Sequence, residues 1–300
     1  MKEKLSLGHP AALLTIVIWA TTFVSTMVLL KCFQPIEILL FRFLLGFMAL
    51  LLVYPKPLRV KEKKHELYFA LAGLSGICVY YLLENIALTY TQASNVGVVI
   101  SVAPIFTALL SRVFLKDRSG QGTGFFVGFA LAMIGIILIS VEGRALQLNP
   151  LGDLLAMLAA LVWACYSLLG RKIAGFGYNI IQTTRRTFVY GIAFMLPTLL
   201  FFDFRWDLSR LSDPTCLLNL LYLGVGASAL CFVTWNFAVK TLGALKTSIY
   251  IYLVPVITAF FSVLILHEKI TVLSASGILL TIAGLAVSQK KERNHYESGD

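Results

Sequence analysis

Charged residues are scarce in this sequence. Asp, Glu, Lys and Arg make up 13% of its 300 residues and hydrophobic residues 58%, whereas an average soluble domain carries about 25% charged residues. A soluble fold could not bury so much apolar surface. Apolar runs of about 18 or more residues, long enough to cross a hydrocarbon core roughly 30 Å thick, recur from end to end. The sequence therefore predicts a membrane protein.

Several chemical motifs are also missing. There is no HExxH, Walker A or CxxC sequence, and the four histidines, His9, His65, His267 and His295, fall near span ends or in connections. The five cysteines are odd in number and lie mostly inside apolar runs, which is typical of reduced packing residues. These absences argue against an enzyme, a metal site, a cofactor and direct use of ATP.

The formal charge of +10 lies in short connections between apolar runs, which indicates membrane topology rather than nucleic-acid binding. Counted by alternate sides, 17 Lys and Arg fall on one side and 5 on the other. Because retained positive charge favours the cytoplasm, we expect both termini to be cytoplasmic in a multi-pass protein of the plasma (inner) membrane. The first apolar run continues to Leu30, too long for a signal peptide.

Continuous apolar runs of this length predict helices rather than the alternating segments of a barrel. Ten spans are expected, at roughly 10–30, 36–54, 67–90, 93–113, 123–140, 151–171, 179–202, 215–239, 244–266 and 272–288. The expected fold class is an all-α membrane protein.

The sequence contains an internal repeat. A shift of 151 residues places Asn85–Asp117 over Asn236–Glu268 without a gap. The identical pairs are Asn85/Asn236, Ala87/Ala238, Ala93/Ala244, Ile100/Ile251, Pro104/Pro255, Thr107/Thr258, Ala108/Ala259, Ser111/Ser262 and Leu115/Leu266. Apolar composition alone would not align Asn, Pro, Thr and Ser in one register.

Two further shifts extend the repeat. A shift of 144 places Trp19 on Trp163 and Arg42 on Arg186, and a shift of 149 pairs Gly128 with Gly277 and Gly135 with Gly284. Each copy holds five spans, an odd number, so the second copy enters the membrane from the opposite side. We expect inverted repeats at 10–140 and 151–288 around a central cavity, then a polar tail at 289–300. Secondary transporters use this architecture.

On these residues the chain resembles the drug/metabolite transporter superfamily, with two EamA-type domains. The pattern is Asn85-x-Ala-x5-Ala followed by Pro104 and Asp117, repeated as Asn236-x-Ala-x5-Ala with Pro255 and Glu268. The resemblance implies a ten-helix bundle whose cavity is lined mainly by spans 1, 3, 4, 6, 8 and 9, with spans 5 and 10 peripheral. It implies no particular substrate, because members carry amino acids, nucleotide-related metabolites, amines and drugs.

Polar and aromatic side chains inside the spans are the candidate substrate-binding residues. Ionisable groups at membrane depth are costly and mark function or pairing. Glu84 could bind a cationic or zwitterionic solute or exchange a proton; alternatively it is hydrated near the outer end of its span, or bonded to a neighbouring helix. The full set is Trp19, Thr22, Tyr80, Tyr81, Glu84, Asn85, Trp163, Tyr166, Ser167, Trp235, Asn236 and Tyr250.

Arg42, Arg185 and Arg186 lie about two turns inside span ends. We expect them to anchor the spans by reaching the interface or helix-end carbonyls; holding a substrate carboxylate is the alternative. Pro104 and Pro255 each remove a backbone hydrogen bond and should kink their helices, shaping the cavity or serving as gates.

The expected function is secondary transport of a small metabolite by alternating access. An amino acid or a related amphipathic or aromatic compound, moved by export or exchange, fits the aromatic candidates best. An uptake permease for an amine or nucleotide-related compound is the alternative, and a scaffold or membrane-embedded enzyme is more remote. The expected partners are a small-molecule substrate and the lipid bilayer, with no nucleic acid. We expect a monomer; a dimer that packs through Gly124-x-x-x-Gly128 is the alternative.

Overall fold

The computed structural model describes residues 2–91, 93–116, 121–143, 149–202, 204–205, 207–257, 260 and 272–289. Over these ranges all regular structure is helical and no strand occurs. Asp117, Glu268 and most of the second half of the ninth predicted span lie outside the described residues.

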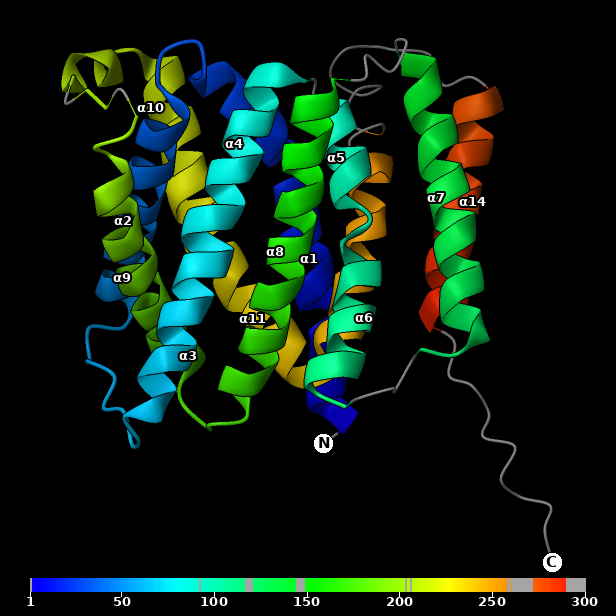
Figure 1. Ribbon diagram of the computed structural model, residues 1–300, viewed down its shortest axis with the longest axis horizontal. Helices are drawn as coiled ribbons and strands as arrows, with labels where there is room; N and C mark the ends of the chain where they lie inside the picture. The colour runs from blue at the N-terminus through cyan, green and yellow to red at the C-terminus, as the bar shows by residue number, and fades with distance from the viewer. Residues whose placement is uncertain are drawn as a thin grey trace, which may run out of the picture.

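The helices follow the predicted spans closely (Figure 1). In the first half they are α1 (Lys2–Leu29), α2 (Pro35–Val53), α3 (Lys64–Gly73), η1 (Leu74–Val79), α4 (Tyr80–Tyr90), α5 (Ala93–Ile100), α6 (Ala103–Phe114) and α7 (Thr123–Gly143). In the second half they are α8 (Pro150–Ala174), α9 (Ile180–Thr198), η2 (Leu208–Ser212), α10 (Pro214–Leu221), η3 (Tyr222–Leu230), α11 (Cys231–Leu242), α12 (Ala244–Ser248), η4 (Ile249–Tyr252) and α14 (Val272–Gln289).

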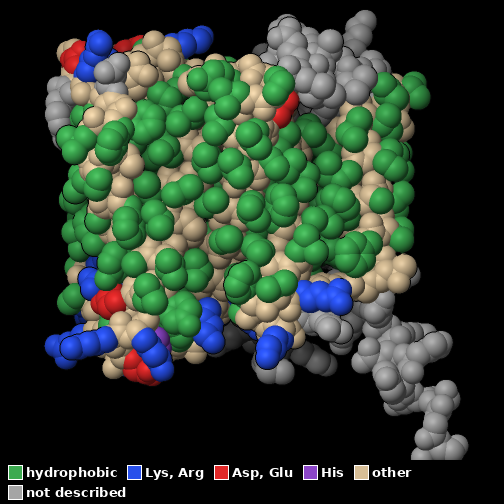
Figure 2. Space-filling model, viewed as in Figure 1, with side chains coloured by type: hydrophobic (Ala, Val, Ile, Leu, Met, Phe, Trp, Pro, Cys, Tyr) green, Lys and Arg blue, Asp and Glu red, His purple; other side chains and the backbone are tan. Residues whose placement is uncertain are grey.

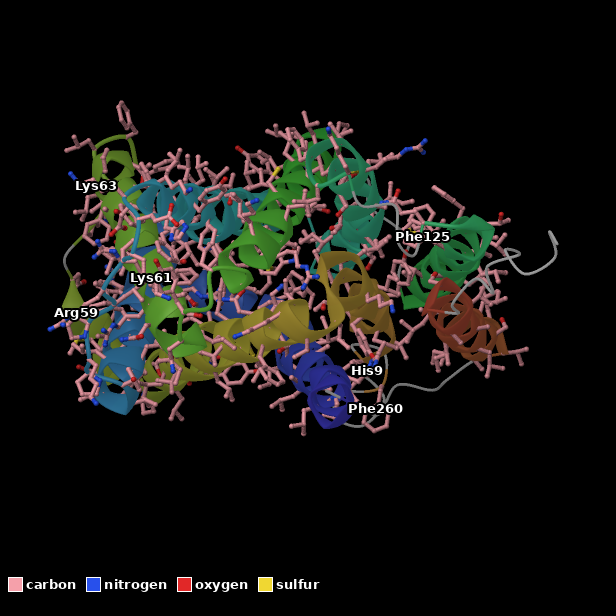
Figure 3. All side chains as sticks on the ribbon, turned by 90° about the horizontal axis from the view of Figure 1, so that it is seen from below. His9, Arg59, Lys61, Lys63, Phe125 and Phe260 are labelled. Atoms are coloured by element: carbon pink, nitrogen blue, oxygen red, sulfur yellow. The ribbon has the colours of Figure 1, made fainter. Side chains whose placement is uncertain are left out.

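Six helical segments within the described residues are long and apolar enough to cross a membrane, and three shorter apolar helices accompany them. The side chains on the flank shown in Figure 2 are mostly hydrophobic, and charged side chains gather at the two ends. The prediction of an all-α membrane protein is confirmed. We call the end that carries the 54–63 connection and the start of α1 the basic end (Figures 1 and 3); Arg59, Lys61 and Lys63 lie on one side of it.

Irregular helix segments occur at matched places in the two halves. The π-helical segment η1, residues 74–79, falls within η3, residues 222–230, after a shift of 151. The break between α5 and α6 stands just before Pro104, and the 3-10 turn η4 stands just before Pro255. Proline cannot donate the hydrogen bond that would continue a helix through these points. The helices are therefore interrupted where the sequence predicted kinks.

Helix contacts are exchanged between the halves in the way that inverted repeats predict. α1 packs on α11, and its counterpart α8 packs on α4. Likewise α2 packs on η3, and its counterpart α9 packs on η1 and α3. The fifth and tenth spans, α7 and α14, pack on each other at one edge of the bundle (Figures 1 and 3).

Small residues bring α7 and α14 close together. A Cβ atom built on Gly284 would stand 2.5 Å from the Gly128 carbonyl oxygen and 2.5 Å from the Ala132 amide nitrogen. One built on Gly135 would stand 2.5 Å from the Gly277 carbonyl oxygen. Backbones can approach this closely only where side chains are absent. The glycine pattern of α7 thus serves packing within the chain.

Candidate functional site

Three tryptophans meet at the centre of the bundle. The ring of Trp19 on α1 lies 5.1 Å from that of Trp163 on α8 and 5.1 Å from that of Trp235 on α11, centroid to centroid. Trp163 and Trp235 are 5.7 Å apart, and Phe232 stands about one helical turn from Trp235, 5.9 Å from Trp19. These spacings are those of attractive aromatic pairs. Both repeats contribute to the cluster.

Further rings extend this cluster. Tyr80 lies 4.8 Å from Trp163 and 4.7 Å from Tyr81. Tyr166 lies 5.0 Å from Trp163. In this conformation the rings contact one another, so the centre is closely packed. We call the whole set the aromatic cluster: Trp19, Phe43, Tyr80, Tyr81, Trp163, Tyr166, Phe188, Phe232 and Trp235. Six of its nine members are candidates from the sequence.

The π-helical segment η3 helps to place Trp19. The Trp19 indole Nε1 donates to the Ala227 carbonyl oxygen at 2.9 Å. A π-helical turn displaces carbonyls from the regular α-helical pattern and is frequently found at functional sites. The indole therefore satisfies a carbonyl of η3 while its ring faces the centre.

Several buried polar atoms have no hydrogen-bond partner, and some of them lie on or beside the aromatic cluster, such as those of Trp235 and Arg42. Among the described residues the atoms without a partner are Arg42 Nη1 and Nη2, Glu84 Oε1, Asn85 Oδ1, Ser167 Oγ, Trp235 Nε1, Thr26 Oγ1 and Tyr252 OH. Each unsatisfied buried group costs free energy and calls for an explanation. Four of these seven side chains, those of Glu84, Asn85, Ser167 and Trp235, belong to the candidate substrate-binding residues named from the sequence.

Other candidates make their own contacts. Asn85 Nδ2 donates to the Pro35 carbonyl oxygen at 3.1 Å. Its repeat mate Asn236 donates to Thr184 Oγ1 at 3.1 Å and accepts from the Tyr166 hydroxyl at 3.0 Å. The two asparagines therefore tie matched helix pairs together, and Asn236 also holds a ring of the aromatic cluster.

Thr22 and Tyr250 lie in different settings from the other candidates. Thr22 Oγ1 donates to the Trp19 carbonyl oxygen within α1, at 2.7 Å. The Tyr250 hydroxyl lies 2.5 Å from His9 Nδ1, near the start of α1. Each of these hydroxyls therefore already has one hydrogen-bond partner outside the aromatic rings.

The three arginines have three different environments. Arg42 is fully buried, and its Nε donates to Ser228 Oγ at 3.1 Å. The prediction that Arg42 reaches the interface is therefore wrong. Arg185 donates to the carbonyl oxygens of Tyr54 and Lys56, as an anchor should. Arg186 pairs with Glu66, with 2.6 Å between Nη2 and Oε1. Arg42 stays in the interior because Ser228 and the neighbouring rings hold it there.

A pocket opens between α8, α9 and α11 toward the basic end. Its cavity volume is about 20 Å³, enough for about one water molecule. Its lining comprises Tyr166, Gly170, Ile173, Ala174, Tyr178, Ile180, Thr183, Thr187, Asn236 and Lys240. Tyr166 belongs to the aromatic cluster, so the pocket borders one edge of that cluster.

At the opposite end of the bundle, Glu37 on α2 binds residues of the connection between α9 and α10. Glu37 is not among the residues predicted from the sequence. Glu37 is fully buried; its carboxylate accepts from the Gln34 amide at 2.7 Å, the Arg205 amide at 2.8 Å and Arg210 Nη1 at 2.8 Å. The Glu37 carboxylate raises the pKa of Arg210. Glu37 stands at the beginning of a span, where a carboxylate resembles an ordinary interfacial residue.

Cys32, Asp213 and Cys216 form a small cluster near these contacts. Their donor atoms all lie within 4.8 Å of one another, and both cysteines are free thiols. Structural zinc sites use four ligands, and the described residues place only these three together. Arg210 donates to the Cys32 carbonyl oxygen at 2.8 Å, which brings a positive charge beside the cluster.

Comparison with known proteins places the chain in a family. The model of the EamA-like transporter family matches residues 6–141 and 150–288. An "Uncharacterized transporter" of Archaeoglobus fulgidus is 29% identical over 95% of this chain and 98% of that protein. A "Probable terminal-alkyne amino-acid exporter" of Streptantibioticus cattleyicolor is 26% identical over 96% of this chain and 95% of that protein. A solved structure titled "Crystal structure of protein" shares the fold at TM-score 0.73 and 18% identity, covering 95% and 98% of the two chains. The chain therefore belongs to the EamA-like transporter family.

Proposed function

We propose that the protein is a secondary transporter that moves a small organic metabolite by exposing one central site alternately to the two sides of the membrane. An amino acid or a related amphipathic or aromatic compound, carried by export or exchange, fits the centre best. The amino-acid exporter name of one relative supports this class of solute.

The observation that carries the proposal is the aromatic cluster and the unpartnered polar atoms on or beside it. Trp19 and Trp163 come from the same position of the two repeats and their rings lie 5.1 Å apart. A site between inverted repeats is equally related to both faces of the membrane, which is what alternating access requires. Aromatic faces can stack on planar solutes or attract cations.

The two ends of the molecule differ from each other. A small pocket lies toward the basic end, while the fully buried Glu37 and its partner Arg210 close the opposite end. Because positive charge is retained in the cytoplasm, the basic end is the cytoplasmic end in our proposal. The closure at Glu37 then lies on the outer side of the membrane.

Counterflow in proteoliposomes tests the proposal. Purified protein is reconstituted with unlabelled amino acids, amines or nucleotide-related compounds inside, and entry of the labelled compound is followed at two pH values. Without a Walker A sequence the exchange should need no ATP. A dependence on pH would indicate that protons take part.

A matched pair of variants links transport to the centre. Trp163→Ala should reduce counterflow by about tenfold or more, because the lost ring contacts are worth at least one factor of ten. Phe114→Ala, which removes a ring 72% exposed on the outer surface of α6, should leave counterflow unchanged. Absence of counterflow across the whole panel, or normal counterflow by folded Trp163→Ala, would contradict the proposal.

A further inference from the structure

Arg42 is a buried cation with unused hydrogen-bonding capacity. Its side chain is fully buried; Nε donates to Ser228 Oγ at 3.1 Å, and Nη1 and Nη2 have no partner. A guanidinium binds a carboxylate through two parallel N–H···O bonds. The Ser228 contact fixes the plane of the group and leaves the two Nη atoms for such a pair.

Glu84 supplies the opposite charge nearby. It is 2% exposed, and its Oε1 has no partner. Glu84 follows Tyr80 and Tyr81 by about one turn of α4, and the Tyr81 ring lies against the Arg42 guanidinium. Among the described residues, however, Arg42 and Glu84 do not form an ion pair with each other. Each charge therefore retains capacity for a further partner.

The aromatic cluster forms a wall beside these charges. The guanidinium carbon of Arg42 lies 4.2 Å from the centroid of the Tyr81 ring. Tyr81 adjoins Tyr80, which adjoins Trp163 at 4.8 Å. Such a dry surrounding strengthens charge interactions, and the ring faces can attract an ammonium group as well.

We propose that Arg42 and Glu84 form a two-point site for a small zwitterion, in which Arg42 binds the carboxylate of the solute and Glu84 binds its ammonium group. This inference rests on the proposed transport function and deepens it by naming the charge pattern of the solute. A lone anion would meet the charge of Glu84, and a lone cation would meet that of Arg42. Only a solute with both charges is complementary to the pair.

The equivalent arginine in the second repeat has a different environment. Arg186, the mate of Arg42, is 38% exposed at its side chain and pairs with Glu66 at 2.6 Å. Arg42 is fully buried and has no such pair. The mate of Glu84 is Trp235, so the charge pair occurs in one repeat only. A role in holding the fold does not explain why Arg42 is left unpaired.

The test is a binding series in which only the charges of the probe change. Purified protein is titrated with L-phenylalanine, with L-phenylalaninamide, which lacks the carboxylate, and with N-acetyl-L-phenylalanine, which lacks the ammonium group. The same three compounds made from L-leucine show whether the result depends on the side chain of the probe. Fluorescence of the central tryptophans reports binding. The zwitterion of at least one series should bind about tenfold or more tighter than either derivative, since each lost charged contact is worth at least that factor.

Replacing either charged residue by a neutral one should remove the preference for the zwitterion over one of the two derivatives. Arg42→Gln should weaken zwitterion binding by about tenfold or more and remove discrimination against the amide, while Glu84→Gln should remove discrimination against the N-acetyl derivative. Arg59→Gln, in the connection before α3, should bind like the wild type. If Arg42→Gln does not fold, Arg42→Lys keeps the charge but lacks the fork and should still weaken carboxylate binding.

Three results would overturn the inference. The first is wild-type preference for the amide or the N-acetyl compound. The second is unchanged discrimination in folded Arg42 and Glu84 variants. The third is counterflow of other solutes by a protein that binds neither zwitterion, which would reject the zwitterion site and leave the transport function standing. Absence of any counterflow would instead reject the transport function itself.

Discussion

Arg42 and Arg186 show that equivalent residues in a repeat can carry different roles. The alignment equates them, yet one is enclosed by rings and the other is paired with Glu66. A buried charge is tolerated only where its environment compensates it. The difference therefore points to a specialised first repeat, in which charge recognition is concentrated.

The closure around Glu37 gives a prediction at the residue scale. Glu37→Ala should lower the free energy of unfolding by about 3 kcal/mol, because it leaves Arg210 and two backbone amides without their acceptor. Titration of detergent-solubilised protein with sodium dodecyl sulfate measures this. Glu62→Ala removes an exposed partner of Lys64 and should cause no measurable loss. Equal stability of the two variants would show that the closure contributes nothing.

Residue type alone singled out Glu84 and Arg42, because an ionisable group inside an apolar run is costly. The expected place of Arg42 was wrong, since it lies in the interior and not at the interface. Their partners were not predictable, because Ser228 comes from a helix 186 residues away from Arg42. A side-chain contact of this kind depends on the rotation and depth of both helices, which an apolar pattern leaves open.

At the scale of helices, the matched irregularities are the most informative feature. The two prolines predicted the interruptions in the fourth and ninth spans through a local mechanism. The π-helical segments η1 and η3 had no such signal. The added width of η3 is stabilised by distant contacts such as the bond from Trp19 to Ala227, so it could not be read from the local sequence.

Packing of α7 on α14 gives a prediction at this scale. Gly284→Ala should lower the free energy of unfolding by about 1–3 kcal/mol. The new methyl group would stand 2.5 Å from backbone atoms of α7, which can shift only if the whole helix shifts. Gly124→Ala, on the same helix pair, would meet its nearest atom at 3.4 Å and should be tolerated. Thermal unfolding in detergent compares the two. Similar unfolding temperatures would contradict the packing described here.

For the molecule as a whole, the sequence predicted the class of protein and the family, and both are confirmed. Composition and span length depend on the bilayer and need no tertiary information. The contacts that join the helices at the two ends of the bundle could not be predicted from the sequence. Glu66 with Arg186 links α3 to α9, and Glu37 with Arg210 closes the opposite end. Which end is open depends on a small free-energy difference between whole conformations.

The central claim is that one site is exposed alternately to both sides, and Ser167 offers the most direct measurement. Ser167 is fully buried on α8, and its Oγ has no partner. A Ser167→Cys variant lacking the five native cysteines is treated with a membrane-impermeant thiol reagent in right-side-out and in inside-out vesicles. The account predicts reaction from both sides, at rates that a transported solute changes. Reaction from one side only, in protein that still carries out counterflow, would contradict it.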